Sequence, residues 1–216
     1  MRSEHRNVNP ISEIGFFFHA ALHLIKKVYL SSTEGFNRFF TVDADLRVRF
    51  YRERGVEYTR RGRYDIGVSM LEQVLLEWPA DEDTLFHLGF CYLKMDRIGD
   101  GIELLERSVA LGGGSIRVGS ILGMAYLQTR EYAKAVEILE RTLKDDPKNF
   151  HLNHRLALAL DQLGQHDRAV ACFEKALEVR PDDPKVHRAL GFTLEQMGRH
   201  VDSVAQFKKA AYLEEL

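Results

Sequence analysis

The sequence repeats itself with a period of 34 residues. In five successive copies one shared position holds a small residue, and its occupants are Gly55, Gly89, Gly123, Ala157 and Gly191. Each copy also has Tyr or Leu three residues after this position and Leu or Phe sixteen residues after it. A fixed period of this length indicates a repeat protein, in which each copy forms one unit that packs on its neighbours.

The length of the period predicts the fold of each unit. A repeat of 34 residues with small residues in this arrangement is typical of the tetratricopeptide repeat (TPR), a pair of antiparallel helices. We therefore predict an all-α TPR solenoid, a right-handed superhelix of helix pairs. The predicted units are a degenerate N-terminal helical segment at 1–47 and five repeats at 48–81, 82–115, 116–149, 150–183 and 184–216.

The recurring small residue has a packing explanation. A glycine inside a helix costs about 1 kcal/mol relative to alanine, so its recurrence needs a compensating gain. We expect the second helix of each unit to cross the first at this position, where a larger side chain would hold the two backbones apart. Replacing Gly123 or Gly191 with Leu should then cost about 1–3 kcal/mol or more through overpacking.

Turn residues fall where this frame requires them. Glycine, which favours helix C-termini, stands at the expected end of three first helices: Gly62, Gly164 and Gly198. Asp183 before Pro184 offers an acidic N-cap with proline at the first helical position. The junction 111–115 instead has three consecutive glycines before Ser115. It is either a looser turn capped by that serine or a hinge between the second and third repeats.

Residues 1–47 fit the repeat poorly. We predict one helix over 11–30 and a second over about 34–46, and we assign self-association to apolar residues of the first: Phe16, Phe17, Phe18, Leu22 and Ile25. Three interpretations stay open. The pair caps the first repeat, or it docks on a neighbouring molecule, or the first helix lies at a membrane interface with Lys26 and Lys27 near the headgroups. At the other end the last helix has no following repeat to cover its apolar side chains, which favours self-association.

Composition narrows the class of partner and the compartment. The formal net charge is −2, and no run of five basic residues or aromatic RNA-binding motif is present, so we do not expect nucleic acid as a partner. Cys91 and Cys172 each fall in an apolar helical pattern, which predicts buried thiols and a reducing compartment. The apolar stretch 14–25 is interrupted by His19 and His23 and is too short to span a bilayer, so we expect a cytoplasmic protein without a cleaved signal peptide.

No pattern in the sequence predicts catalysis. The glycines at 112–114 lack the following lysine of a phosphate-binding loop, and no Ser or Cys has a histidine partner by motif. The pairs His19 with His23 and His151 with His154 can each share a helix face, but neither has a third metal ligand nearby. We therefore predict no enzyme activity, cofactor, metal or small-molecule substrate. Metal uptake by either histidine pair stays an alternative to solvated or partner-facing side chains.

The remaining candidate for function is a binding surface. In a TPR solenoid the first helices line the concave side, and outward positions two, five, nine and twelve of each unit form one stripe. These positions combine an apolar floor with basic groups towards both ends, a pattern that favours binding of an extended or helical peptide and points to an acidic one. The predicted groove residues are Arg49, Arg52, Phe86, Phe90, Leu93, Arg117, Met124, Leu127, His151, His154, Leu158, Lys185, Arg188 and Phe192.

Four stretches of the chain carry a closer resemblance. They are FYRERGVEYTRRGRYDIGVSMLEQV at 50–74, HLGFCYLK at 87–94, GIELLERS at 101–108 and KVHRALGFTLEQMGRH at 185–200. The residues of these stretches that differ from the general TPR consensus resemble those of the MamA family, the magnetosome-associated TPR proteins of magnetotactic bacteria. The resemblance covers roughly residues 42–213.

This resemblance implies a location and a role. It implies a cytoplasmic protein, peripheral on the cytoplasmic face of the magnetosome membrane, the vesicle that encloses an iron mineral crystal. It also implies homo-oligomers in which the degenerate N-terminal repeat engages a neighbour's groove, contacts with other magnetosome-associated proteins, and support of magnetosome activation and biomineralisation. Contact with the membrane would be indirect, through these partners. The residues themselves leave an alternative open, a monomeric TPR peptide-binding adaptor in another cytoplasmic pathway.

Overall fold

The computed structural model describes residues 15, 17–18, 20–22, 44–112 and 115–215. Within these residues every regular element is a helix, which confirms the predicted all-α fold class. The chain divides into two units, Met1–Pro79 and Ala80–Leu216, and each is described by itself.

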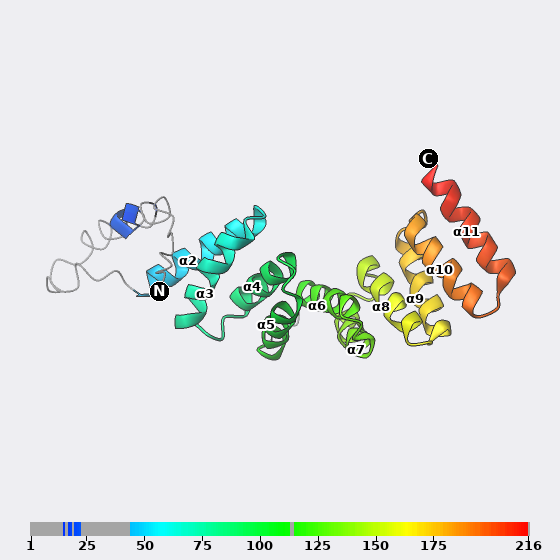
Figure 1. Cartoon of the computed structure of the whole chain (residues 1–216), viewed down its shortest axis with the longest axis horizontal. Helices are drawn as coiled ribbons and strands as arrows, with labels where there is room; N and C mark the ends of the chain where they lie inside the picture. Colours follow the sequence, from blue (N-terminus) through cyan, green and yellow to red (C-terminus); the bar gives the residue numbers. More distant parts are fainter. Residues whose placement is uncertain (1–14, 16, 19, 23–43, 113–114, 216) are drawn as a thin grey trace, which may run out of the picture. The chain divides into compact units, whose positions relative to one another are not determined.

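In the first unit two long helices pack against each other. They are α2, Ala44–Arg60, and α3, Tyr64–Glu77, drawn in cyan in Figure 1. A surface ion pair, Arg47 Nη2 to Glu77 Oε1 at 3.2 Å, also joins them. Because α2 begins at Ala44, residues 44–47, which we placed in the N-terminal segment, are continuous with the first helix of the first full repeat. The rest of the helix predicted over 34–46 lies outside the described residues.

The second unit is a succession of helix pairs, which follow one another in chain order from green to red in Figure 1. The helices of each pair are connected by a short turn, and each pair packs on the next through the second helix of one and the first helix of the other. The eight helices of this unit are α4 (Glu82–Lys94), α5 (Ile98–Ala110), α6 (Ile116–Gln128), α7 (Tyr132–Leu143), α8 (Phe150–Gln162), α9 (His166–Val179), α10 (Pro184–Gln196) and α11 (His200–Glu214).

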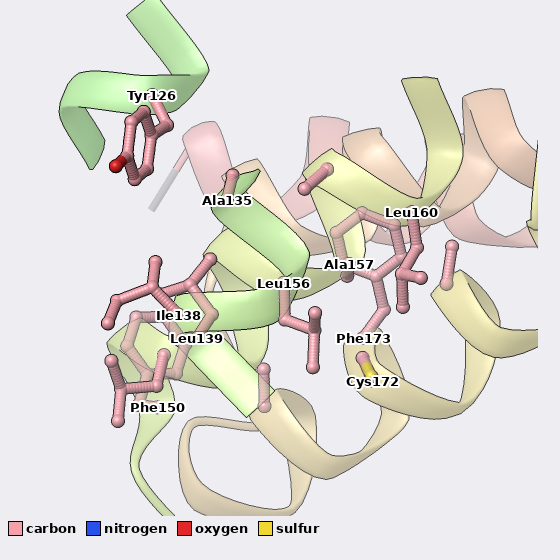
Figure 2. Close-up of a cluster of buried hydrophobic side chains, with 14 of the residues drawn as sticks. Tyr126, Ala135, Ile138, Leu139, Phe150, Leu156, Ala157, Leu160, Cys172 and Phe173 are labelled. Carbon is pink, nitrogen blue, oxygen red and sulfur yellow. The ribbon is translucent and has the colours of Figure 1, made fainter. Parts of the chain in front are cut away.

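The small-residue position lies at the crossing of the two helices in each pair. A Cβ built on Gly191 would lie 2.7 Å from Cε1 of Phe207, and one built on Gly123 would lie 2.5 Å from Cδ2 of Leu139. In the pair α8–α9 the position holds Ala157, and Figure 2 shows the ring of Phe173 beside it. Glycine thus allows a close approach of two helices that a side chain would hold apart.

Every first helix ends in the same turn. One residue of this turn has a positive φ, and its occupants are Gly62 (74°), Asp96 (62°), Arg130 (62°), Gly164 (73°) and Gly198 (74°). The following N–H then donates to a carbonyl five residues earlier, as Arg199 N does to Leu194 O at 2.9 Å, which is the Schellman pattern of a helix C-terminus. Glycine adopts this conformation without a steric cost, whereas Asp96 and Arg130 place a Cβ in it.

The first helices of the second unit also begin alike. A side-chain oxygen accepts a hydrogen bond from a backbone N–H of the first turn in each, and the capping residues are Asp81, Ser115, Asn149 and Asp183. Asp183 Oδ1 accepts from Lys185 N at 3.0 Å and Val186 N at 3.1 Å, and Pro184 follows it as predicted. Ser115 caps α6 with a longer bond, 3.4 Å from Oγ to Val118 N. These caps satisfy N–H groups that a helix start leaves unpaired.

The core runs through the second unit from one pair to the next. Figure 2 shows part of it, where Leu139 and Ile138 of α7 approach Phe150 and Leu156 of α8. Cys91 and Cys172 are both buried thiols, as their position in the apolar pattern predicted. The core holds the first helices in a fixed row and so positions their outer faces.

Candidate partner-binding surface

The first helices of the second unit form a row of their own. Helix α4 contacts α6, α6 contacts α8, and α8 contacts α10, although each pair is separated by a complete second helix in the sequence. The predicted groove residues of this unit lie on that row. Arg49 and Arg52 lie on α2 in the first unit, where Arg49 is exposed and Arg52 half-buried.

The predicted apolar floor is narrower in the structure. Phe86 is only 5% exposed and belongs to the core, which corrects its assignment to an open surface. The reason is that the guanidinium of Arg117 lies over its ring, 4.2 Å from the centroid, and the Phe90 ring stacks at 6.4 Å. Leu93 points towards the second helix, where a Cβ on Gly101 would lie 2.8 Å from its side chain.

Other apolar side chains of the row remain accessible to different degrees. Phe90 and Met124 are half-buried, and Leu127 and Leu158 pack against the core while staying partly exposed. Phe192 on α10 is 56% exposed and makes an edge-to-face contact with Phe207, with ring centroids 5.0 Å apart. An exposed aromatic ring on a fixed helix is a suitable anchor for a polypeptide partner.

The charges on α4 and α6 compensate each other. Arg117 Nη2 lies 3.3 Å from Asp83 Oδ1, so position two of one repeat pairs with position two of the next. The same guanidinium covers Phe86. This half of the row therefore presents a neutral pair to a ligand.

On α8 and α10 the basic groups gather around a buried ring. Phe150, which is 7% exposed, has the guanidinium of Arg180 over its face at 4.2 Å. The imidazole of His151 meets the same ring edge-on at 5.1 Å, and that of His154 lies at 6.0 Å. Lys185 is the second residue of α10, it is exposed, and its charge acts on His154. Arg188 is also exposed but pairs with Glu214.

Arg155 adds a further charge to this cluster. One guanidinium nitrogen donates to the backbone oxygen of Ser120 at 2.8 Å and to its hydroxyl, and the other lies 3.8 Å from Met124 Sδ. The residue is half-buried, and burial lowers the pKa of its guanidinium. Its partners on α6 are a carbonyl, a hydroxyl and a thioether, so its positive charge is not cancelled.

Burial and neighbouring charges keep the two histidines neutral more readily than usual. Burial is the largest cause that lowers the pKa of His154, which Arg155, His151 and Lys185 lower further while Asp183 opposes them. For His151, burial again comes first, and the charges of Arg180 and Arg155 lower its pKa further. Burial is thus the main cause of both lowered pKa values, and the nearby cations add to it.

Sequence reasoning missed Arg155 and Arg180. Arg155 occupies position six of its repeat, which the outward stripe omits, and the equivalent positions hold Glu53, His87, Ile121 and Ala189. Because this column already varies between charged, polar and apolar residues, it gave no signal for a binding residue. Arg180 lies just after α9, outside any first helix, so a stripe of first-helix positions could not include it.

Three comparisons relate the chain to known proteins. A family model described as tetratricopeptide repeat matches residues 126–210. Two curated relatives, each named Magnetosome protein MamA, come from Paramagnetospirillum magnetotacticum and Magnetospirillum gryphiswaldense, and both are 39% identical to the chain. The matches cover 37% and 38% of this chain and 36% and 37% of the relatives, so they span just over a third of the relatives' length.

Solved structures extend the match along the chain. One called MamA MSR-1 C2 is 41% identical with a TM-score of 0.73, and the alignment covers 79% of this chain and 98% of that one. The chain belongs to the MamA family. A second structure, called MamA AMB-1 C2221, is 42% identical with the same TM-score over 78% of this chain and 99% of that chain. Membership of this TPR family supports a role in protein–protein interaction.

The described N-terminal residues of this MamA-family chain include large apolar side chains that are exposed. Phe17, Phe18 and Leu22 are 62%, 70% and 56% exposed, whereas Ala20 on the same helical stretch is 4% exposed. The other predicted self-association residues, Phe16 and Ile25, lie outside the described residues, as do His19, His23, Lys26 and Lys27. Three large apolar side chains in water favour an interaction with another surface.

The part of the chain that the structure describes has neither a cluster of metal ligands nor a membrane-spanning helix. No group of three metal-ligating side chains comes together there, so His151 and His154 have no third ligand among the described residues. No helix in that part has the length and apolar character needed to cross a bilayer.

Proposed function

We propose that this MamA-family chain is a non-enzymatic scaffold that self-assembles and recruits other proteins at the magnetosome surface, where it supports magnetosome activation and biomineralisation. In this proposal it is peripheral on the cytoplasmic face of the magnetosome membrane and reaches the membrane only through its partners. The magnetosome assignment rests on the relatives named Magnetosome protein MamA. The scaffold assignment rests on the TPR match and on the row α4–α6–α8–α10.

The observation that carries the binding role is the face of that row. It offers an exposed ring at Phe192, a half-buried Met124 between two helices, and the uncompensated bases around Phe150. Aromatic and basic groups on a fixed framework are the usual anchors of protein interfaces. We propose that the groove residues predicted from the sequence, with Phe86 removed and Arg155 and Arg180 added, contact the partner.

Self-assembly is proposed to use the N-terminal residues and the groove of a neighbour. Exposure of Phe17, Phe18 and Leu22 supports this, because such side chains gain free energy when a second molecule covers them.

Oligomer size in solution tests self-assembly. We expect the full chain to form species larger than a monomer in size-exclusion chromatography with light scattering, and we expect Phe17→Glu with Phe18→Glu to shift it towards a monomer. Leu76→Glu, which changes a 75% exposed apolar residue of the same unit, is the matched control and should leave the oligomer unchanged. A wild-type chain that is strictly monomeric at high concentration rules out self-assembly.

The location is tested separately in cells. A fluorescently tagged copy should follow the magnetosome chain in the source cell, and high salt or carbonate should release it from isolated magnetosomes, as expected for a peripheral protein. A diffuse cytoplasmic signal that persists with the untagged copy deleted contradicts the magnetosome assignment and favours an adaptor in another pathway.

A further inference from the structure

We propose that the outer faces of α8 and α10 form a docking site for an acidic polypeptide segment, whose carboxylates are contacted by His151, His154, Arg180 and Lys185. This inference rests on the proposed scaffold function and names the chemistry of the partner at one part of the row.

The first argument is an imbalance of charge. Among the described residues, none of these four side chains, nor Arg155, forms an ion pair with a carboxylate. Several bases elsewhere in the unit do, including Arg117 with Asp83, Arg168 with Glu140, Arg188 with Glu214 and Lys209 with Asp182. A cationic cluster left open on a protein with a net charge of −2 is complementary to a local negative charge on a partner.

The carboxylate that acts on both histidines, Asp183, is already engaged at the start of α10. Asp183 faces the cluster, as its effect on both histidines shows. However, one oxygen of Asp183 accepts hydrogen bonds from Lys185 N and Val186 N at the start of α10. Its charge is therefore directed at the helix N-terminus, and the four side chains remain available to a ligand.

The second argument is preorganisation. Arg180 and both imidazoles are held against the buried Phe150 ring, and His154 also contacts Phe173, with ring centroids 6.1 Å apart. Side chains already restrained by packing lose less conformational entropy when a ligand binds. Arg155 fixes α8 to the Ser120 carbonyl of α6 behind them.

The surroundings favour a short acidic polypeptide over a long polyanion. The cationic cluster is bounded on α10 by the Arg188–Glu214 pair, near the end of α8 by Asp161 with His166, and on the row by the neutral Arg117–Asp83 pair. A nucleic acid or an anionic bilayer would place many charges against these acids as well. Next to the cluster, Met124 and Leu158 offer partly exposed apolar surface. Apolar side chains of the ligand that lie between two of its carboxylates can pack there.

Fluorescence anisotropy with a labelled peptide of alternating Glu and Leu tests the site. We expect the wild-type chain to bind it at least about tenfold more tightly than the matching Gln–Leu peptide at low salt, with the difference shrinking as salt is added. Arg180→Glu with Lys185→Glu should abolish this preference. Lys175→Glu with Lys208→Glu makes the same change of charge at exposed residues of α9 and α11 and should change the affinity by less than about twofold.

A pH series adds a readout that a general charge effect would not give. Binding should tighten as the pH falls from about 7.5 to 5.5, because His151 and His154, whose pKa values are lowered in the free protein, take up protons from water and the bound carboxylates favour their charged form. The other charged groups that act on them are Asp183, Arg155, Arg180 and Lys185. His151→Gln with His154→Gln should remove the tightening while the Lys175/Lys208 control keeps it.

The outcomes separate the two levels of the proposal. Equal affinity for the Glu–Leu and Gln–Leu peptides, or equal losses in the two charge-reversed pairs, overturns the docking site. Displacement of the peptide by phosphatidylserine vesicles assigns the cluster to a membrane and also overturns it. If the chain forms oligomers but ignores the acidic peptide, only this inference fails; if it neither forms oligomers nor binds either peptide, the scaffold function fails. Lys185→Glu alone, at an exposed residue, keeps the test valid if the double variant is unstable.

Discussion

The two halves of the second unit, α4–α7 and α8–α11, have the same repeat frame and different inner faces. In both halves a small residue lies at the helix crossing, a polar side chain caps each first helix, and a residue of positive φ ends it. Between α4 and α6, Arg117 pairs with Asp83, whereas on and beside α8 and α10 several bases cluster around Phe150 with no acidic partner among the described residues. Arg155 connects the halves by reaching from α8 to Ser120 on α6.

This difference separates the residues that build the fold from those that distinguish this surface. The frame positions are occupied by Gly, Ala, Leu and Phe for reasons of packing, and substitutions there should change stability in both halves. The outward positions vary from repeat to repeat because packing constrains them less. The uncompensated charges of the second half are thus the feature that a partner can select.

A larger side chain at the helix crossing should give the largest loss of stability. This substitution tests the packing frame that the two halves share. Gly123→Leu should destabilise the unit by about 3 kcal/mol, because even a Cβ at that position lies 2.5 Å from Leu139. Gly99→Leu is the control, since nothing lies within 4 Å of a Cβ there and α5 gains a better helix former. Urea denaturation followed by circular dichroism measures both, and equal stability of the two variants contradicts the packing account.

Removing a helix cap should have a smaller effect that distinguishes the halves. Asp183→Ala should cost about 1 kcal/mol, because Asp183 accepts from two backbone N–H groups of α10. Ser115→Ala should cost less, since its single bond to Val118 N is 3.4 Å long. The urea midpoints of the two variants measure the losses of stability. A larger loss for Ser115→Ala would contradict the expectation that Asp183 is the stronger cap.

The turn residues allow a prediction of opposite sign in the two halves. Arg130 has φ 62° where Gly164 and Gly198 occupy the equivalent positions. Arg130→Gly should therefore stabilise the unit by roughly 0.5 kcal/mol, the relief of the strained Cβ being partly offset by glycine's unfolded-state entropy. Gly164→Ala should destabilise it. Thermal unfolding of both variants is the measurement, and a loss of stability in Arg130→Gly would show that its conformation carries no strain.

The smallest effect concerns pH and belongs to the second half. The pKa of His154 is lowered in the folded protein, so the unfolded chain binds more protons as the pH falls below about 6.5 and stability decreases there. His154→Gln should lose less stability than the parent between neutral and mildly acidic pH. His200→Gln, which replaces a 70% exposed imidazole on α11, should not reduce that loss. Chemical denaturation at the two pH values measures the difference.

The repeat frame could be predicted from the sequence because the packing of each helix pair requires the same kinds of residue at a fixed spacing. Gly123 and Gly191 occupy the same position in repeats that lie two periods of 34 residues apart. At the helix crossings that they predict, Leu139 and Phe207 lie opposite them. The turn at Gly164 could be predicted in the same way. Arg130 could not, because an arginine gives no local signal for a positive φ, and only its place in the frame suggests one.

The surface was harder to predict because exposure depends on neighbouring repeats. Phe86 occupies an outward position of α4, yet Arg117 from the next repeat covers its ring. Arg180 was missed because a residue between helices reached the α8 face through a contact with Phe150 that no helical period encodes. Contacts between side chains 30 or more residues apart in sequence thus decide which outward residues a ligand can reach.

Hydrogen–deuterium exchange with the acidic Glu–Leu peptide tests the central claim most directly, because it locates the contact on the row of first helices. The account predicts slower exchange near the starts of α8 and α10, around His151 and Lys185, and at the C-terminal end of α9 beside Arg180. The rest of α9 and all of α11 should be unchanged, and the Gln–Leu peptide should give no protection. Protection confined to α9 and α11, or none anywhere at a saturating concentration of peptide, would contradict the claim that the first helices bind the partner.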